Sequence, residues 1–237
     1  MPMHAACKIR ALITLAGALV VVGCAAQTHK IEPSANARAV AGHPAVGQPY
    51  EVVGSESLLI VRVYRGGTLA RAGHNHIVAS HNLAGTVYVA KDLARSSFEL
   101  EMPVAELTVD EAELRAAQGV DFAADVPDSA KDGTRRNMLG AAVLDAEHYP
   151  QISLRSQGLD AEGDRLMTQV EVRIRDQVRS FTVPVSYTLT SNELLATGEL
   201  PLKQTDLGLA PFTALLGALQ VQDEMQLQFR IVARVQK

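Results

Sequence analysis

Residues 170–186 read VEVRIRDQVRSFTVPVS, and this stretch is the strongest indication of the fold in the sequence. In its first half, Val170, Val172 and Ile174 alternate with charged residues. In its second half, apolar residues again take every other position from Phe181 onward. Since successive side chains of a β-strand point to opposite faces, this alternation predicts two strands that each bury one face.

The same period of two recurs along most of the chain after residue 50. It is clearest over 98–104 (FELEMPV) and over 227–234 (LQFRIVAR). The whole pattern predicts about eight or nine strands, mostly joined by short polar turns such as 160–164. The further strands are expected at about 57–64, 76–80, 83–90, 151–157 and 193–202.

One interval, 108–149, has a different pattern. Asp110 and Glu113 stand at capping-box spacing and Gly119 provides a C-terminal stop, which together predict a short helix. A second helical piece is expected near 128–146. A parallel α/β sheet would need a helix between most strands. We therefore predict an all-β fold, a closed antiparallel eight-stranded β-barrel with a short helical insertion over one opening.

The N-terminal segment has the features of an export signal. Residues 1–10 carry Lys8 and Arg10 and no acid, and 11–23 (ALITLAGALVVVG) are apolar and then small. This apolar run is too short to cross ~30 Å of hydrocarbon as a helix, so a secretory signal is favoured over a membrane span. The sequence Val21-Val22-Gly23-Cys24 resembles the bacterial lipobox, which implies cleavage before Cys24 and acylation of its thiol.

The predicted anchor sets the expected location and layout. One acyl chain holds a protein only marginally on a membrane, whereas two or three hold it stably. Ala25 follows the cysteine where an inner-membrane retention signal would resemble Asp, so we expect a lipid-anchored protein on the periplasmic side of the outer membrane. The expected layout is a signal peptide at 1–23, a flexible tether at 24–49 and one barrel domain at 50–237. The alternative is an ordinary secretory signal in which Cys24 is incidental.

Composition and charge exclude several classes of partner. Without Lys8 and Arg10, the 22 basic residues fall to 20 against 26 acidic ones, a net charge of −6. A nucleic-acid partner is therefore not expected, because it would need a basic surface. Aromatic residues make up 4% of the chain and Trp is missing, so the core must be aliphatic. The sequence identifies no protein partner.

Catalysis has little support in the sequence. No G-x-S-x-G nucleophile elbow occurs, and the only cysteine after residue 23 is the predicted acylation site. Glu99 and Glu101 share a strand face, as paired acid–base carboxylates would, but they lie opposite the apolar face and are expected to face water. We therefore expect a binding protein rather than an enzyme.

The histidines of His74-Asn75-His76 suggest a second kind of site. On an extended strand these two side chains point to the same face and can share one Zn or Cu ion, with His81 as a third ligand after a turn. Two other interpretations stay open. The imidazoles can bond backbone carbonyls or water at a barrel rim, or they can bond the polar head group of a lipid.

Several segments in a fixed order carry a family resemblance. They are the opening strand 50–57, His74 and His76 ahead of Gly85, 148–156 (HYPQISLRS), 178–185 (VRSFTVPV), 204–209 (QTDLGL) and 219–231 with Asp223. Together they resemble the YceI-like family of bacterial periplasmic proteins over about residues 50–235. The resemblance implies a lipocalin-like barrel whose elongated apolar tunnel holds a polyisoprenoid or a similar lipid chain. The chain departs from the family's common L-x-G-V-T-x-P stretch around Arg175-Asp176-Gln177, where a tighter or more polar turn is expected.

The apolar strand faces supply the candidate ligand contacts. An aliphatic lining suits a flexible chain, since burial contributes ~0.8 kcal/mol per CH₂. The segment 207–219 (LGLAPFTALLGAL) is either a core connection or the mouth through which a lipid chain enters. The residues expected to line the barrel are Phe98, Leu100, Met102, Ile152, Leu154, Val170, Val172, Phe181, Val183 and Phe229.

Three hypotheses of function follow. The first is an envelope lipoprotein whose barrel binds an isoprenoid quinone, a polyprenyl lipid or a fatty-acid-like chain for sequestration or carriage. The second is a metal- or haem-linked redox or hydrolytic protein that uses His74 and His76. The third is a structural or stress lipoprotein with no ligand. On the first hypothesis no cofactor is expected other than the bound polyisoprenoid lipid.

Overall fold

The structure is a computed structural model that describes residues 46–162 and 165–236. The predicted signal peptide, Cys24 and nearly all of the predicted tether lie outside the described residues, so acylation stays a prediction. None of the described helices is long and apolar enough to cross a membrane.

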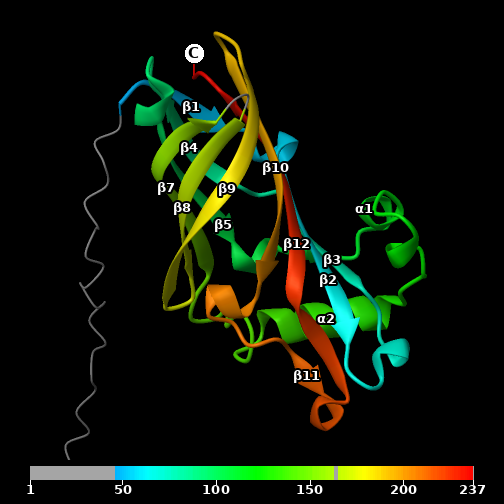
Figure 1. Ribbon diagram of the computed structural model, residues 1–237. Coiled ribbons are helices and arrows are strands. Elements are labelled where there is room, and N and C mark those ends of the chain that lie inside the picture. The colour runs from blue at the N-terminus through cyan, green and yellow to red at the C-terminus, as the bar shows by residue number, and fades with distance from the viewer. Residues whose placement is uncertain (1–45, 163–164, 237) are drawn as a thin grey trace, which may run out of the picture. The chain divides into compact units, whose positions relative to one another are not determined.

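Twelve strands and several short helices make up the described chain (Figure 1). The strands are β1 Gln48–Val52, β2 Leu58–Gly66, β3 His76–Ser80, β4 Ala84–Val89, β5 Ser97–Pro103, β6 Thr108–Val109, β7 Gln151–Glu162, β8 Arg165–Ile174, β9 Gln177–Leu189, β10 Glu193–Lys203, β11 Thr213–Ala214 and β12 Leu219–Arg234. The helices are η1 Gly54–Glu56, η2 Ala70–Ala72, η3 Leu93–Arg95, η4 Val104–Glu106, α1 Ala112–Ala116, η5 Val120–Phe122, α2 Asp128–Leu139, η6 Thr205–Leu207 and η7 Leu215–Gly217.

Eight of the strands close into a ring. The hydrogen-bonded order is β1, β4, β5, β7, β8, β9, β10 and β12, and β12 then pairs with β1. Every pairing in the ring is antiparallel. The structure therefore confirms the predicted closed antiparallel eight-stranded barrel.

Strand β12 also carries a second set of strands outside the ring. Its last residues pair with β1, whereas Gln220 to Arg230 pair with β2, which continues into β3 and β6. Ser57 stabilises the connection between β1 and β2. Its hydroxyl donates to the Val53 carbonyl (2.9 Å) and accepts from the Val232 N–H (3.0 Å) of β12. At its last residues β12 thus closes the ring by pairing with β1. Along the rest of its length β12 pairs with β2, and at that end the ring is open.

The helical insertion lies at the end where the ring parts. Helix α2 crosses this end behind β12 in Figure 1, and its Met138 and Leu139 pack against the main hydrophobic core. The structure confirms the predicted insertion but shortens its second helix, because Gly140 takes an extended conformation (φ −71°, ψ 166°) and ends α2 there. Residues 141–149 form turns rather than helix.

The predicted capping box at Asp110 and Glu113 is wrong. Helix α1 begins after Glu111, and no side chain caps it. Asp110 has a left-handed backbone (φ 56°) and turns its carboxylate into the core, where the Ile77 N–H donates to it at 2.9 Å. The spacing fits a local motif, but the carboxylate has partners more than 30 residues away in sequence.

Pro184 and Gly198 affect the barrel wall on the two sides of β10. Pro184 has no N–H to donate, and the pairing of β9 with β10 extends only from Leu189 to Ser186. Gly198 lies opposite Phe229, and a Cβ at Gly198 would stand 2.4 Å from the Phe229 ring. The aromatic ring therefore lies over the glycine on the inner side of the wall.

This contact makes a prediction about stability. Gly198→Ala should lower the free energy of unfolding by about 1–3 kcal/mol, because the new methyl group displaces the Phe229 ring. Urea denaturation measures the effect. Adding Phe229→Leu to Gly198→Ala should return part of the loss, since the two positions are in contact.

Gly158 provides the matched control, because it lies in strand β7 and a Cβ there meets nothing within 4 Å. Gly158→Ala should leave the free energy of unfolding unchanged or raise it slightly. Equal destabilisation by the two glycine substitutions would contradict the close packing of Phe229 on Gly198.

Candidate ligand-binding cavity

The inner faces of the strands enclose two apolar cavities. One, of about 360 Å³, lies at the α2 end and is lined mainly by β2, α2 and the segment 204–221. The other, of about 180 Å³, lies farther along the barrel between β5, β8, β9 and β12. The two cavities adjoin, because the same five side chains line both: Leu59, Leu154, Val172, Leu202 and Leu227.

All ten residues predicted to line the barrel face these cavities. Met102 and Ile152 line the cavity at the α2 end, and Leu154 and Val172 line both. The remaining six line the second cavity: Phe98, Leu100, Val170, Phe181, Val183 and Phe229. Glu99 and Glu101 are exposed on the outer face, as their alternation with this set predicts.

Sequence reasoning missed the part of the lining that comes from the insertion and the loops. Thr134, Asn137 and Met138 face the cavity from α2, and Phe212 faces it from the segment before β11. Alternation in strands could not find them, since they lie on a helix and in a loop. The spacing of Thr134 and Met138, four residues apart on one helix face, was the available signal.

Polar groups gather at one end of this apolar space. His74, His76, Thr134, Asn137 and Gln204 all line the cavity at the α2 end. In the second cavity the lining is almost wholly apolar. The combined space therefore has one end that can bond a polar group and a long remainder that can take only hydrocarbon.

A buried carboxylate positions His76 at the polar end. The Asp110 side chain is fully buried, and its two oxygens accept from His76 Nδ1 (2.6 Å) and from the Arg115 guanidinium (2.6 Å). Burial acts to raise the pKa of Asp110, but the hydrogen bonds from His76 and from the Ile77 N–H, together with Arg115, hold it below its usual value. Asp110 is therefore an ionised hub that joins β3 to α1.

This hub also fixes the orientation of the His76 ring. Nε2 faces α2, and the Thr134 hydroxyl lies 3.3 Å from it. When the ring is neutral and its Nδ1–H donates to Asp110, Nε2 is a hydrogen-bond acceptor. Arg115 extends the network by donating to the carbonyls of Asn75 (2.8 Å) and Ala124 (2.9 Å). The insertion is thus tied to the strand that carries His76.

Asp110, His76 and Thr134 stand in the order of an acid–base–hydroxyl triad. Two features argue against acyl transfer. Arg115 pairs with the carboxylate that would have to stabilise a charged imidazole. Thr134 lies inside a helix, where backbone N–H groups are already hydrogen-bonded and do not form an oxyanion hole.

The structure brings two of the three candidate metal ligands together. The His74 and His76 rings lie 6.2 Å apart between centroids. His81 instead pairs with Glu111, whose carboxylate lies 3.0 Å from its Nε2. Over the described ranges, no group of three or more His, Cys, Asp or Glu side chains could hold a metal ion. Metal binding by His74 and His76 stays a prediction without a third ligand.

A closed antiparallel barrel with an internal apolar cavity and a helical cover defines a lipocalin-like architecture. The YceI-like domain model matches residues 66–233, and the chain therefore belongs to the YceI-like family. No curated protein sequence matches the chain significantly.

Two solved structures share this fold. BcnA from Burkholderia cenocepacia is 18% identical, with a TM-score of 0.56 over 77% of this chain and 99% of that one. A polyisoprenoid binding domain from Saccharophagus degradans, implicated in plant cell wall breakdown, is 11% identical, with a TM-score of 0.55 over 79% of this chain and 98% of that one.

The Asp110 network makes a prediction about stability. Asp110→Asn should lower the free energy of unfolding by about 3–5 kcal/mol at neutral pH, because it leaves the Arg115 charge buried without its partner. Urea unfolding at several pH values measures the effect. The folded pKa is lowered, so the stabilisation by Asp110 is complete above the ordinary carboxylate value and is lost as the pH falls through the folded value. The gap between wild type and variant should therefore narrow in acid.

Glu111→Gln is the control, because the neighbouring carboxylate pairs with a half-exposed His81. Its effect should stay within about 1 kcal/mol. A pH-independent gap for Asp110→Asn, or equal effects of both variants, would contradict the assignment of Asp110 as the ionised hub.

Proposed function

We propose that this protein binds one elongated, mainly aliphatic lipid chain inside its barrel and carries or sequesters it, without catalysing a reaction. We further propose that it does so as a lipoprotein, acylated on Cys24, on the periplasmic side of the outer membrane. A polyisoprenoid, such as a polyprenyl lipid or an isoprenoid quinone, is the ligand class that we favour over a fatty-acid-like chain.

The adjoining apolar cavities are the observation that supports lipid binding. A volume of about 360 Å³ for the larger one already falls within the range of small-molecule sites. Its continuation past Leu154 and Val172 makes the space longer than a compact metabolite needs. Leu, Val, Ile, Met and Phe side chains favour a hydrocarbon chain, since nothing in the second cavity could pair with a charge.

The polar end supports a ligand with a head group that can donate a hydrogen bond. His76 Nε2 is an acceptor in the neutral ring, and the Thr134 hydroxyl can donate to it or accept from a ligand. Asn137 adds an amide to the same end. A chain with a terminal hydroxyl or a phenolic head would meet partners here and bury its tail toward the second cavity.

The relatives agree with this proposal. The Saccharophagus degradans domain of the same fold is described as polyisoprenoid binding, and the family match covers all ten of the predicted lining residues. The residues of this chain that would contact such a ligand are the ten lining residues predicted from strand alternation.

Organic extraction of the protein purified from native membranes, followed by mass spectrometry, tests the proposal. We expect one lipid with a long aliphatic chain at close to one equivalent per protein. Repeated recovery of protein with no lipid, and failure of the lipid-free protein to take up a polyprenol, would contradict the proposal.

A variant that fills the cavity sharpens this test. Val172 lines both cavities, so Val172→Phe should reduce the extracted lipid several-fold by closing the passage between them. Glu171→Gln, on the outer face of the same strand, is the matched control and should retain the lipid. Circular dichroism on both variants separates loss of the ligand from loss of the fold. Full lipid occupancy in folded Val172→Phe protein would place the ligand outside the barrel.

A further inference from the structure

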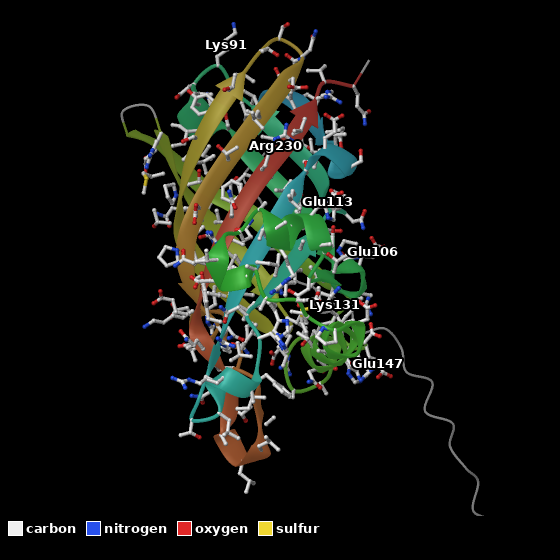
Figure 2. The ribbon with its side chains drawn as sticks, turned by 90° about the vertical axis from the view of Figure 1, so that its right-hand side faces the viewer. Lys91, Glu106, Glu113, Lys131, Glu147 and Arg230 are labelled. Atoms are coloured by element: carbon white, nitrogen blue, oxygen red, sulfur yellow. The ribbon has the colours of Figure 1, made fainter. Side chains whose placement is uncertain are left out.

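Three exposed leucines form an apolar tip at the end of the β2 and β12 strands. We define the apolar tip as Leu69, Leu215 and Leu216. Leu69 is about half-exposed, Leu215 is 68% exposed and Leu216 is fully exposed. The turn that carries Leu69 and the η7 turn that carries the other two lie side by side in both views, at the end of this pair of strands (Figures 1 and 2). Folding alone gives little reason for apolar side chains here, since Leu215 and Leu216 lie mostly in solvent.

The backbone of the tip is also in an unfavourable conformation. Leu215 and Leu216 both have left-handed φ angles, 51° and 55°, and Gly217 continues the series at 87°. Residues with a Cβ rarely adopt this region, and two in a row outside glycine are unusual. Backbone strain of this kind persists where function requires a particular presentation of side chains.

Hydrogen bonds hold the tip in place. The Leu69 N–H donates to the Ala218 carbonyl (2.8 Å), and the Ala218 N–H donates to the Leu215 carbonyl (3.1 Å). Strand β11 pairs with β12 next to them through Thr213 and Gln220. The two turns therefore present their leucines as one ordered surface.

The charged side chains within the two segments that carry the tip are all cationic. Residues 64–75 and 207–222, the two segments that carry the tip, contain no Asp or Glu. The same segments contain Arg65 and Arg71, and both are exposed. Asp206 and Asp223 stand just outside the second segment, whereas Arg71 is only two residues from Leu69. An apolar surface with exposed cations beside it is complementary to a bilayer with anionic head groups.

The tip also adjoins the cavity. Arg65, His74, Phe212 and Leu219 line the cavity at the α2 end, and they belong to the same two segments as the leucines. Any surface bound to the tip would therefore lie next to the polar end of the apolar space. A lipid chain could exchange between bilayer and barrel there without crossing water.

We infer that the apolar tip is a membrane-docking surface. Leu69, Leu215 and Leu216 enter the interface of a bilayer, and Arg71 lies against anionic phospholipid head groups. This inference goes beyond the proposed function, since it holds whichever lipid the cavity binds and whether or not Cys24 is acylated. Each buried leucine should raise the partition of the protein onto the membrane by about tenfold or more.

A tryptophan at the tip tests the inference directly, because the natural chain has none. The purified full chain carrying Leu216→Trp is mixed with vesicles of phosphatidylethanolamine and phosphatidylglycerol whose acyl chains are brominated. Bromine quenches tryptophan only on contact, so we expect strong quenching and a blue-shifted emission. Val120→Trp is the matched control, since Val120 is 91% exposed but lies on η5 outside the tip. Anchoring by an acyl chain would bring both position 216 and position 120 near the bilayer. Insertion of the tip, in contrast, quenches only the tryptophan at position 216.

A second variant separates docking from folding. Leu216→Gly should raise the urea midpoint, because glycine tolerates the left-handed backbone, and should lower binding to the same vesicles about tenfold or more. Arg71→Glu should weaken binding to vesicles with phosphatidylglycerol and leave binding to purely zwitterionic vesicles unchanged.

Several results would overturn the inference. Equal quenching at positions 216 and 120 would do so, and so would unchanged vesicle binding by Leu216→Gly. A blue shift of Leu216→Trp that depends on protein concentration without vesicles would assign the tip to contact between copies of the chain.

Lipid extracted in full from a tip variant that no longer binds vesicles would leave the proposed cavity function intact and isolate the role of the tip.

Discussion

Strand β12 forms hydrogen-bonded ladders along both of its edges. One edge pairs with β10 over eleven residue pairs, from Glu193 opposite Arg234 to Lys203 opposite Glu224. The other edge is shared, since β1 takes only the last two positions and β2 takes most of the rest. The ring is therefore closed at one end and parts at the other. Helix α2 and the segment 204–221 occupy the parted end, and there the interior stays wide enough for the larger cavity.

The insertion needs its own attachment, and a buried charge network provides it. Asp110 joins His76 on β3, Arg115 on α1 and the backbone of Ile77 within one set of hydrogen bonds. Removing one member of such a network lowers the free energy of unfolding by more than the intact network contributes to it, because the remaining charge stays buried without its partner. The network fixes the orientation of the His76 ring and turns Nε2 toward Thr134. The hydrogen bonds that attach the helical insertion to the barrel therefore also form the polar end of the cavity.

The sequence was sufficient for the barrel and for most of the cavity wall. Alternation places Phe98, Val172 and Phe229 on the inner face because a strand in a closed barrel has only one inner and one outer side. The same logic fails for the insertion. Asp110 matches a capping box with Glu113, yet its partners His76 and Ile77 are more than 30 residues away, where no local pattern could indicate them. From the sequence, segment 207–219 was either a core connection or the mouth of the cavity. The structure buries its first part and exposes a later part. Leu207 and Leu209 are buried, while Leu215 and Leu216 are exposed.

The central claim is that a hydrocarbon chain occupies the barrel with its polar group at His76. This binding mode can be followed by methyl and imidazole NMR of the lipid-free protein during titration with farnesol, a hydroxyl-terminated isoprenoid. Binding inside the barrel should saturate at one equivalent, with shifts in the methyl groups of Leu154 and Val172 and in His76 Nε2. Val178, exposed on β9, should not change. Shifts confined to exposed methyl groups such as that of Val178, or a response that never saturates, would contradict it.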